Sequence, residues 1–514
     1  MLLTLITFIP LIGAVLVLLT PRMLEGVHKR LALFFSLASL GLCLPLAAYY
    51  PYGRSGFHYT ALVPWIPTLG VDYRVGLDGL SLMLVVLTAL LSALSIYSSF
   101  ESIKKREKEF YFFMLLLECG ALGTFVALDL FLFFFFWELM LTPMVFIIGI
   151  WGGQERIYSS VKFFLYTAFG SALMLLVIFY LYFEAGRQLG GSPSFNYENF
   201  AALQLDSSVQ IGLFIAFALA FFIKMPLFPF HTWLPFAHTE APTAGSVLLA
   251  GILLKTGVYG FLRFAVSIFP QACVILTPYI LGLAIAGVIY GALIAMIQRD
   301  VKRLVAYSSV SHMGMLMAGV LAWNVQGVEG GILQAINHGL STGALFLIVG
   351  MIYERRHTRE ISEFGGLAKT MPIFAVFFMI FTLSSIGLPG LNGFVGEFLI
   401  LVGLMGRSIV WTLLAATGVV LGAAYMLKLY QRMMFGPITV EANKELQDLN
   451  QREFRILLPL AIFCFLIGLY PYPFQKAIEP TAKQIVEYVQ PYLPASQWNA
   501  SSNGSSEAQA DEKP

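Results

Sequence analysis

The sequence predicts an all-α polytopic membrane protein with about 14 transmembrane helices. Composition is the first observation, since 58% of the 514 residues are hydrophobic, 12% are charged, and the mean hydropathy is +0.79. A chain this apolar must lie mostly in lipid. The second observation is a series of apolar windows, each long enough to cross about 30 Å of hydrocarbon. The third is an uneven distribution of positive charge between alternate loops.

The apolar windows follow one another along almost the whole chain. They lie near residues 2–20, 31–49, 77–98, 110–127, 129–150, 160–183, 209–230, 242–264, 275–297, 303–322, 331–353, 371–405, 409–431 and 455–474. The first window has neither a basic segment before it nor a small-residue cleavage site, so we predict a span and not a removed signal peptide. After the last window the chain becomes polar, and a C-terminal tail is expected over 476–514.

Positive charge predicts which way the chain crosses the membrane. Most of the 31 lysines and arginines fall in alternate loops, at 21–30, 99–109, 151–162, 231–241, 298–303, 354–370 and 428–455. Cytoplasmic loops are enriched in these residues. We therefore expect these loops in the cytoplasm, both termini on the outer, periplasmic side, and an integral protein of a bacterial inner membrane.

Seven ionisable side chains stand inside the predicted spans. They are Glu118, Glu138, Lys224, Lys255, His312, His338 and Glu397. An ammonium at the bilayer centre costs about 2.5–3.5 kcal/mol even on lenient scales, so it is retained mainly where it faces partners or water. Alternatives stay open for Glu118, as a hydrogen-bonded structural acid, and for either histidine, as a satisfied core residue. Lys224 and Glu138, opposite in sign and close to helix centres, indicate ion movement.

The seventh and twelfth spans are predicted to be discontinuous. In FFIKMPLFPFHTW, Pro226 and Pro229 follow Lys224 and cannot donate backbone hydrogen bonds. In SSIGLPGLNGFVGEF, glycines around Pro389 precede Glu397. Broken backbone is tolerated at membrane depth only beside protein or a water-filled cavity. Both charges are therefore expected beside a wet interior.

The two broken spans also predict two inverted five-helix repeats. The twelfth span follows the seventh at an offset of five spans, an odd number, so a segment repeated at that offset enters the membrane from the other side. Paired interrupted helices of this kind indicate a transport path near the bilayer midplane. The expected domains are three N-terminal spans at 1–108, a first repeat at 109–266, a second repeat at 267–435, a loop and last span at 436–475, and the tail at 476–514.

A polar segment, HTWLPFAHTEAPT, follows the first broken span and contains His231, His238 and Glu240. It is either a mouth for proton uptake or a hydrogen-bonded turn between two helices, and these residues alone do not decide. The spacing does not fit zinc, because two histidines six residues apart with a single acid lack further ligands.

No bound cofactor is predicted for this chain. The sequence contains no Gly-rich nucleotide loop, haem attachment motif or metal-spaced His/Cys cluster. Its cysteines lie far apart and are expected to be packing residues. They are Cys43, Cys119, Cys273 and Cys464.

These motifs resemble the antiporter-like subunits of proton-pumping NADH:quinone oxidoreductase, respiratory complex I, which are related to subunits of multi-subunit Na+/H+ antiporters. The resemblance rests on FLFFFFWELMLTPM, AFFIKMPLFPFHTWLPFAHTEAPTAGSVLLAGILLKTGVYG, SSVSHMG, INHGLSTGALF and GLPGLNGFVGEF. It covers nearly the whole chain and is strongest from about residue 70 to 440. Glu397 resembles the branch called chain M, because the sister chains L and N typically carry lysine there.

The resemblance implies a translocase subunit that moves protons while redox chemistry proceeds in other subunits. It assigns proton transfer to Glu138, Lys224, Lys255 and Glu397, with His312 and His338 as relays. Glu118, His231 and His238 are further candidates. NADH, FMN, iron–sulfur clusters and quinone are expected in partner subunits, among which chains L and N would be neighbours. This chain is expected to carry no redox centre and to contact lipid but no nucleic acid.

We expect Glu138 to hold the ammonium of Lys224. At about 4 Å and an effective dielectric of about 20, their attraction is about 4 kcal/mol, which is comparable with the effect of burial on a lysine. Moving the acid away would release a proton, which would pass through water, Lys255 and the histidines to Glu397 and leave on the outer side.

Three other interpretations stay open. A subunit of an Mrp-type Na+/H+ antiporter shares every feature except Glu397, and a membrane-bound hydrogenase subunit shares the same ancestry. A purely structural membrane anchor predicts that charge removal changes assembly but not pumping. Sodium dependence, and co-purification with a flavin- and iron–sulfur-containing assembly that oxidises NADH, distinguish these functions.

Overall fold

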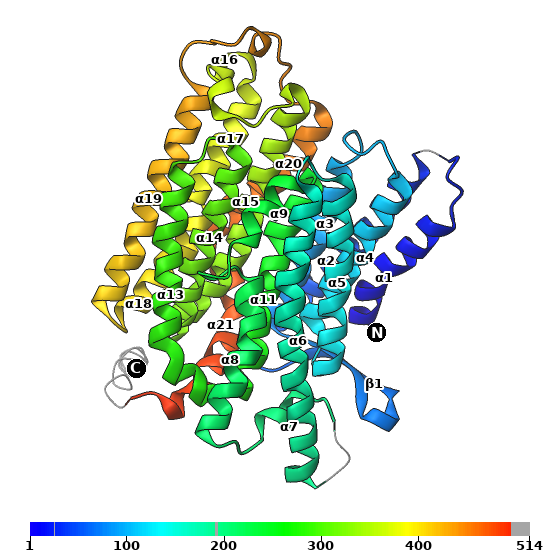
Figure 1. The fold of residues 1–514 in the computed structure, drawn as a ribbon, viewed down its shortest axis with the longest axis vertical. Helices are drawn as coiled ribbons and strands as arrows, with labels where there is room; N and C mark the ends of the chain where they lie inside the picture. The colour runs from blue at the N-terminus through cyan, green and yellow to red at the C-terminus, as the bar shows by residue number, and fades with distance from the viewer. Residues whose placement is uncertain (25, 191–193, 495–514) are drawn as a thin grey trace, which may run out of the picture.

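The computed structural model describes residues 1–24, 26–190 and 194–494 (Figure 1). Long helices stand side by side along the longest axis, and a small β-hairpin and a short helix project at one end. The predicted helical membrane architecture is confirmed, and the hairpin is an addition to it. Of the predicted tail at 476–514, residues 495–514 lie outside the described residues, whereas residues 476–489 belong to a helix that begins at Tyr472.

The helices and strands have the following bounds. The first half contains α1 (Leu2–Leu19), α2 (Val27–Ala48), β1 (His58–Ile66), β2 (Val71–Leu77), α3 (Gly79–Ser98), α4 (Glu107–Val126), α5 (Leu130–Trp151), α6 (Arg156–Leu189), α7 (Tyr197–Ala201), α8 (Ser207–Lys224) and α9 (Trp233–Glu240). One composite helix follows, made of α10 (Thr243–Leu248), η2 (Leu249–Leu253), α11 (Leu254–Gly260), η3 (Phe261–Ala265) and α12 (Val266–Ile268), where η2 and η3 are π-helical. The second half contains α13 (Pro270–Met296), α14 (Val301–Val320), α15 (Val325–Arg356), α16 (Leu367–Thr370), α17 (Pro372–Ser385), α18 (Asn392–Met405), α19 (Ile409–Met434), α20 (Gln451–Leu469) and α21 (Tyr472–Val489).

Eleven helices of the described residues are long and apolar enough to cross a membrane, or twelve when the bent pair α20–α21 counts as one. The helix α14 is not among them, and α17 and α18 are each too short. Judged by helix length and composition, fewer than the expected 14 spans are found among the described residues. Polar residues in α14 and the break between α17 and α18 account for part of the difference.

The seventh span breaks directly after Lys224, where α8 ends. The backbone carbonyls at the break are nevertheless paired. The Leu227 N–H donates to Phe222 O at 2.9 Å, and the Trp233 indole N–H donates to Ile223 O at 2.9 Å. The predicted discontinuity is confirmed, and protein groups satisfy these two carbonyls, as the membrane interior requires.

The expectation of a loop at 231–241 is wrong. Most of this segment is α9, which packs against α6 and α14 and buries Trp233, Leu234 and His238. The aromatic and apolar residues between the polar ones give α9 a face to bury, so the segment continues the broken span.

The second break separates α17 from α18 and depends on glycine. Gly387 and Gly390 have φ angles of +72° and +92°, a region that favours glycine. At Gly393 a Cβ atom would lie 2.0 Å from Ser384 O, so only glycine allows α18 to start against the end of α17. The Ser384 hydroxyl also donates to Asn392 Oδ1 at 2.5 Å. The predicted discontinuous helix before Glu397 is confirmed.

Two long helices occupy the middle of the bundle. The composite helix Thr243–Ile268 and α15 are enclosed along their apolar windows by the rest of the chain. The helix α15 packs on α3, α14, α17, α18 and α21. Polar side chains on these two helices therefore face protein and not lipid.

The two ends of the bundle differ in chemistry. The loops rich in lysine and arginine lie together at one end, here called the basic end, and are joined by the ion pairs Arg22–Glu109 at 2.5 Å and Arg452–Glu101 at 2.8 Å. The hairpin β1–β2, α7 and α21 lie at the opposite end, here called the hairpin end (Figure 1).

The amphipathic helix α21 closes the hairpin end by docking on the start of α3. At Gly79 a Cβ atom would lie 1.7 Å from Ala477 O, so glycine is required for this approach. Asp78, which precedes α3, forms a buried ion pair with Arg263 of η3 and accepts a hydrogen bond from the Thr481 hydroxyl at 3.2 Å. We call Asp78, Arg263 and Thr481 the α21 clasp.

Candidate functional site

The centre of the candidate site is a contact between Lys255 and His338. Lys255 lies on α11, between the two π-helical turns, and His338 faces it from α15. The Lys255 Nζ atom is 2.6 Å from His338 Nδ1 and donates to Ala250 O at 2.5 Å. Both side chains are fully buried. Since π turns inside helices often mark functional positions, the irregular backbone and the buried charge coincide here.

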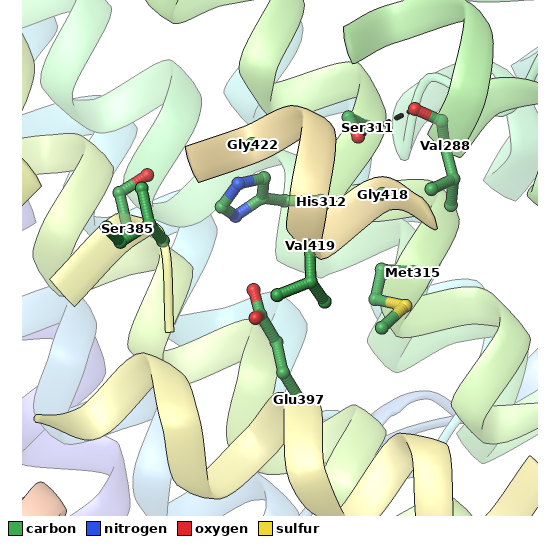
Figure 2. A pocket seen from close by; sticks show the side chains of 10 residues that line it. Val288, Ser311, His312, Met315, Ser385, Glu397, Gly418, Val419 and Gly422 are labelled. Atoms are coloured by element: carbon green, nitrogen blue, oxygen red, sulfur yellow. Dashed lines mark hydrogen bonds between the residues drawn. The ribbon is translucent and has the colours of Figure 1, made fainter. Parts of the chain in front are cut away.

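His312 extends this contact toward the second broken helix. Its ring centroid lies 5.7 Å from that of His338, and its imidazole lines a small cavity between α13, α14, α17, α18 and α19. The cavity volume is about 10 Å³, close to the space that one water molecule needs. Figure 2 shows the His312 ring and the Glu397 carboxylate pointing into this cavity from different helices.

Amide side chains of α15 hold Glu397 in place. The Gln334 amide donates to Glu397 Oε1 at 3.2 Å. Asn337, one turn further along α15, donates to Asn392 O at 2.7 Å and to Gln334 Oε1 at 3.3 Å. The carboxylate therefore sits in a polar network, with the cavity on one side and the start of α18 on the other.

Lys224 is buried, but it does not form the expected close pair with Glu138. Within the described residues there is no ion pair between them at 4.0 Å or less, although Glu138 interacts electrostatically with Lys224. The ammonium instead lies 5.0 Å from the ring centroid of Trp137 and 5.7 Å from that of Phe163. Cation–π contacts of this kind stabilise a desolvated ammonium by about 2 kcal/mol.

Glu138 is less deeply buried than Lys224. Its side chain is half-buried in this chain, and its Oε1 atom has no hydrogen-bond partner among the described residues. The helix α5 presents one face to the bundle and the other to its surroundings, and the carboxylate lies between the two. Trp137, its neighbour in sequence, points inward and donates to the Ser171 hydroxyl at 3.0 Å.

The structure places Glu118 away from the central group. It lies on α4, faces Ser36 of α2, and is buried with both carboxylate oxygens lacking a hydrogen-bond partner among the described residues. Among the described residues no hydrogen bond joins it to Lys255 or the histidines, and none supports the alternative of a hydrogen-bonded structural acid.

The two histidines of the segment after the first break occupy different positions. His231 stacks on Phe228, with ring centroids 5.5 Å apart, and meets Tyr290 edge-on at 5.1 Å. His238 is completely buried on α9 and stacks almost flat on Phe346 of α15, with centroids 4.6 Å apart. Neither ring nitrogen of His238 has a hydrogen-bond partner among the described residues.

Comparison with known proteins assigns the family. The transmembrane family described as NADH:quinone oxidoreductase/Mrp antiporter matches residues 127–422, and the amino-terminal family of NADH-ubiquinone oxidoreductase chain 4 matches residues 59–123. The chain belongs to the NADH:quinone oxidoreductase/Mrp antiporter family. The resemblance seen in the sequence motifs is thereby confirmed.

Relatives within the oxidoreductase/antiporter family cover almost the full chain. NADH-quinone oxidoreductase subunit M of Rhodobacter capsulatus is 43% identical over 95% of this chain and 96% of its own length. NADH-ubiquinone oxidoreductase chain 4 of Chondrus crispus is 40% identical over 93% of this chain and 96% of its own length. The similarity to chain M, indicated by Glu397, is thus confirmed at the level of the whole sequence.

Solved structures of the oxidoreductase/antiporter family and its relatives share the fold. A chain of respiratory complex I from Thermus thermophilus with bound NADH superimposes with a TM-score of 0.86 at 34% identity, over 95% of this chain and 100% of that one. A chain of the Mrp complex from Dietzia sp. gives a TM-score of 0.82 at 23% identity, over 96% of this chain and 99% of that one. The second likeness shows the common fold alone.

Several polar residues of this family member were not expected as part of the site. Gln334 and Asn337 lie three residues apart on one face of α15, and this i, i+3 spacing next to His338 is the signal that sequence analysis could have used. Lys302 was counted among loop charges, yet it is buried and donates to Ala241 O at 2.5 Å. The four cysteines are buried and unpaired, as expected of packing residues.

Proposed function

We propose that this chain moves protons across the membrane as a membrane-arm subunit of an NADH:quinone oxidoreductase, driven by redox chemistry in other subunits. The observation that carries the proposal is the row of buried ionisable groups that runs across neighbouring helices, Lys255–His338–His312–Glu397. Buried ionisable residues at membrane depth are costly and are kept where they serve a path. Their mutual contacts make the row continuous enough for proton transfer.

The row can pass a proton without net chemical change. An ammonium at Lys255 can give its proton to His338 Nδ1, since the two atoms are already within hydrogen-bond distance. The imidazole can release a proton from its other nitrogen, because each ring nitrogen can carry one. His312 and a water in the adjacent cavity would then carry the proton to Glu397. Lys255 must afterwards be reprotonated before the next transfer.

Lys224 and Glu138 are proposed to set the protonation of this row from a distance. Their charges interact although the groups do not touch. A shift of α5, or a charge on a neighbouring subunit beside the half-buried Glu138, would change the field at Lys224. The interaction between Glu138 and Lys224 can then change in strength. A neighbouring subunit can alter such an interaction more easily than it can break a close salt bridge.

The finer topology is part of the proposal. We infer 14 spans by counting α8–α9 and α17–α18 as broken spans and α14 as a polar one, with two inverted repeats at 109–266 and 267–435. The basic end would face the cytoplasm of a bacterial inner membrane, and both termini would lie outside. Chains L and N would be neighbours, and NADH, FMN, iron–sulfur clusters and quinone would belong to other subunits.

The decisive experiment measures proton translocation and quinone reduction in inside-out vesicles that contain the assembled complex. Lys255→Met should lower proton translocation by roughly a hundredfold or more, because it removes the donor to His338. Lys428→Met, at an exposed lysine on the outer face of α19, is the matched control and should leave pumping unchanged. Normal pumping in Lys255→Met vesicles would refute the proposal.

The antiporter interpretation is the second candidate, since the Mrp chain shares the fold. It predicts that transport depends on sodium and persists in the absence of NADH-oxidising partners. A sodium-independent proton signal that requires NADH favours the oxidoreductase subunit.

A further inference from the structure

We propose that two amide side chains of α15, Asn337 and Gln334, form a relay that specifies a carboxylate at position 397 and fixes which of its two oxygens takes up the proton. The inference rests on the proposed function and deepens it, because it names two specificity-determining residues. Both are positioning residues, since they act on the proton only through Glu397.

The direction of the relay is set by a backbone carbonyl, that of Asn392 at the start of α18. A carbonyl oxygen only accepts hydrogen bonds, so Asn337 must turn its amide nitrogen toward Asn392 O, at 2.7 Å. The same nitrogen donates to Gln334 Oε1 at 3.3 Å. Gln334 therefore turns its own nitrogen away from Asn337, and this nitrogen donates to Glu397 Oε1 at 3.2 Å.

The relay cannot reverse without losing hydrogen bonds. If the Gln334 amide turned over, its nitrogen would face the Asn337 nitrogen, a donor against a donor. If both amides turned over, Asn337 Oδ1 would face Asn392 O, an acceptor against an acceptor. Both side chains are buried, and a buried polar group that loses its partner destabilises the fold. The observed direction is therefore strongly preferred.

Close packing holds the relay in place. Gly396 of α18 lies against it, and a Cβ atom there would be 2.4 Å from Gln334 Oε1 and 3.0 Å from Asn337 Nδ2. The Asn392 side chain donates to Asn337 O at 3.4 Å and accepts from the Ser384 hydroxyl. The relay is thus joined to both sides of the second break, to α17 through Ser384 and to α18 through Asn392.

The fixed direction of the relay decides which side chain fits at position 397. The Gln334 nitrogen presents a donor there, and a carboxylate accepts it. An ammonium has three donors and no acceptor, so a lysine at this position would meet the Gln334 nitrogen as a donor against a donor. The relay therefore favours an acid over a base at this depth of the membrane.

The relay also gives the two oxygens of Glu397 different roles. Oε1 accepts from Gln334, which provides the only hydrogen bond to this carboxylate among the described residues. Oε2 lies at the break, where a Cβ atom on Gly387 would be 2.4 Å from it, and Ser385 beside the break lines the cavity with His312 (Figure 2). A proton from the cavity binds at Oε2 and leaves from it, while Oε1 keeps its hydrogen bond in both states.

The first test reverses the direction of the last hydrogen bond. Glu397→Lys, which sets a donor against a donor, and Gln334→Glu, which sets two carboxylates face to face, should each lower proton translocation by roughly tenfold or more in inside-out vesicles. The double variant should pump roughly fivefold faster than either single variant, because a carboxylate at position 334 accepts from both Asn337 and the lysine. A double variant no faster than Glu397→Lys would overturn the inference.

The control for this rescue is Gln326→Glu, at an exposed glutamine in the first turn of α15. It adds the same charge to the same helix outside the relay, so it should not rescue Glu397→Lys. Rates are compared per assembled complex, so that a folding defect does not count as a loss of pumping. Equal rescue by Gln326→Glu would show a general effect of charge and would contradict the relay.

The second test releases Gln334 without altering positions 334 and 397. Asn337→Leu removes the donor that orients the Gln334 amide, which then becomes free to turn its oxygen toward position 397. Adding Glu397→Lys to Asn337→Leu should therefore cost only about threefold or less, compared with the tenfold loss in the parent background. A merely structural role of Asn337 predicts the full loss in both backgrounds, and that result would also overturn the inference.

The outcomes separate this inference from the proposed function. If Lys255→Met abolishes pumping while Gln334→Glu fails to rescue Glu397→Lys, the relay is wrong and the function stands. If Lys255→Met pumps normally, the proposed function fails, and the inference fails with it. Loss of pumping in Lys255→Met together with rescue of Glu397→Lys by Gln334→Glu supports both.

Discussion

Two of the buried lysines, Lys224 and Lys255, are stabilised by different means. Lys255 has a carbonyl and an imidazole within hydrogen-bond distance, and the imidazole can take its proton directly. Lys224 has no hydrogen-bond partner among the described residues and lies over two aromatic rings. Ring faces attract a charge but accept no proton. Lys255 is therefore placed to transfer a proton. Lys224 is placed to hold a positive charge that acts on other groups electrostatically.

At the residue scale, the contact between Gln334 and Glu397 gives a direct prediction. A hydrogen bond to a charged group contributes about 1.5–3 kcal/mol, so Gln334→Leu should slow proton translocation by roughly tenfold or more. Because the effect acts through one contact, Gln334→Leu should add little in a Glu397→Gln background. Pumping rates of the two single variants and the double variant measure this. Additive losses would show that Gln334 acts elsewhere.

At the scale of elements, the positions of the charged groups depend on how each helix starts and ends. Asp129 caps α5, the helix that carries Glu138, by accepting hydrogen bonds from the N–H groups of Phe131 and Leu132 at 2.9 Å each. Burial raises the pKa of the Asp129 carboxyl to about 6. The folded protein therefore loses stability as pH rises from about 4 to about 6, because the buried group must then ionise.

This cap predicts a pH-dependent difference between two substitutions. Asp129→Ala should lower the free energy of unfolding by about 1 kcal/mol near pH 4, because the cap is lost. Asp129→Asn keeps a capping oxygen and cannot ionise, so its melting temperature in detergent should equal that of the parent near pH 4 and reach or exceed it near pH 8. A melting temperature of Asp129→Asn that falls with rising pH relative to the parent would contradict the assignment.

The breaks in the helices were predictable, but the pairing of side chains across helices was not. Proline after Lys224 and glycine before Glu397 act on the local backbone, so the sequence alone indicates both breaks. The distance between Glu138 and Lys224 depends instead on how α5 and α8 are rotated and tilted, and no local pattern fixes that. The contact of Lys255 with His338 and the burial of Lys302 under the end of α9 also depend on how helices are rotated and tilted. The sequence therefore did not predict them.

At the scale of the whole molecule, the separation of a basic end from a hairpin end predicts the orientation. Ser208 is exposed at the start of α8, near the hairpin end, and Gln451 is exposed at the basic end. The substitutions Ser208→Cys and Gln451→Cys place one thiol at each end. In intact cells a membrane-impermeant maleimide should label the first and not the second, since basic loops stay in the cytoplasm. Inverted vesicles should give the opposite pattern. Labelling of Gln451→Cys in intact cells would reverse the topology.

The α21 clasp also constrains when the fold can be completed. The Thr481 hydroxyl reaches Asp78 across 403 positions of sequence, and the carbonyl of Ala477 seals the space above Gly79. During synthesis Arg263 and Asp78 are both available before the ribosome delivers α21, so the hairpin end of the nascent bundle stays open until then. Insertion of the early spans is then separate in time from closure of the hairpin end, because α21, late in the sequence, joins the start of α3 to the middle of the chain.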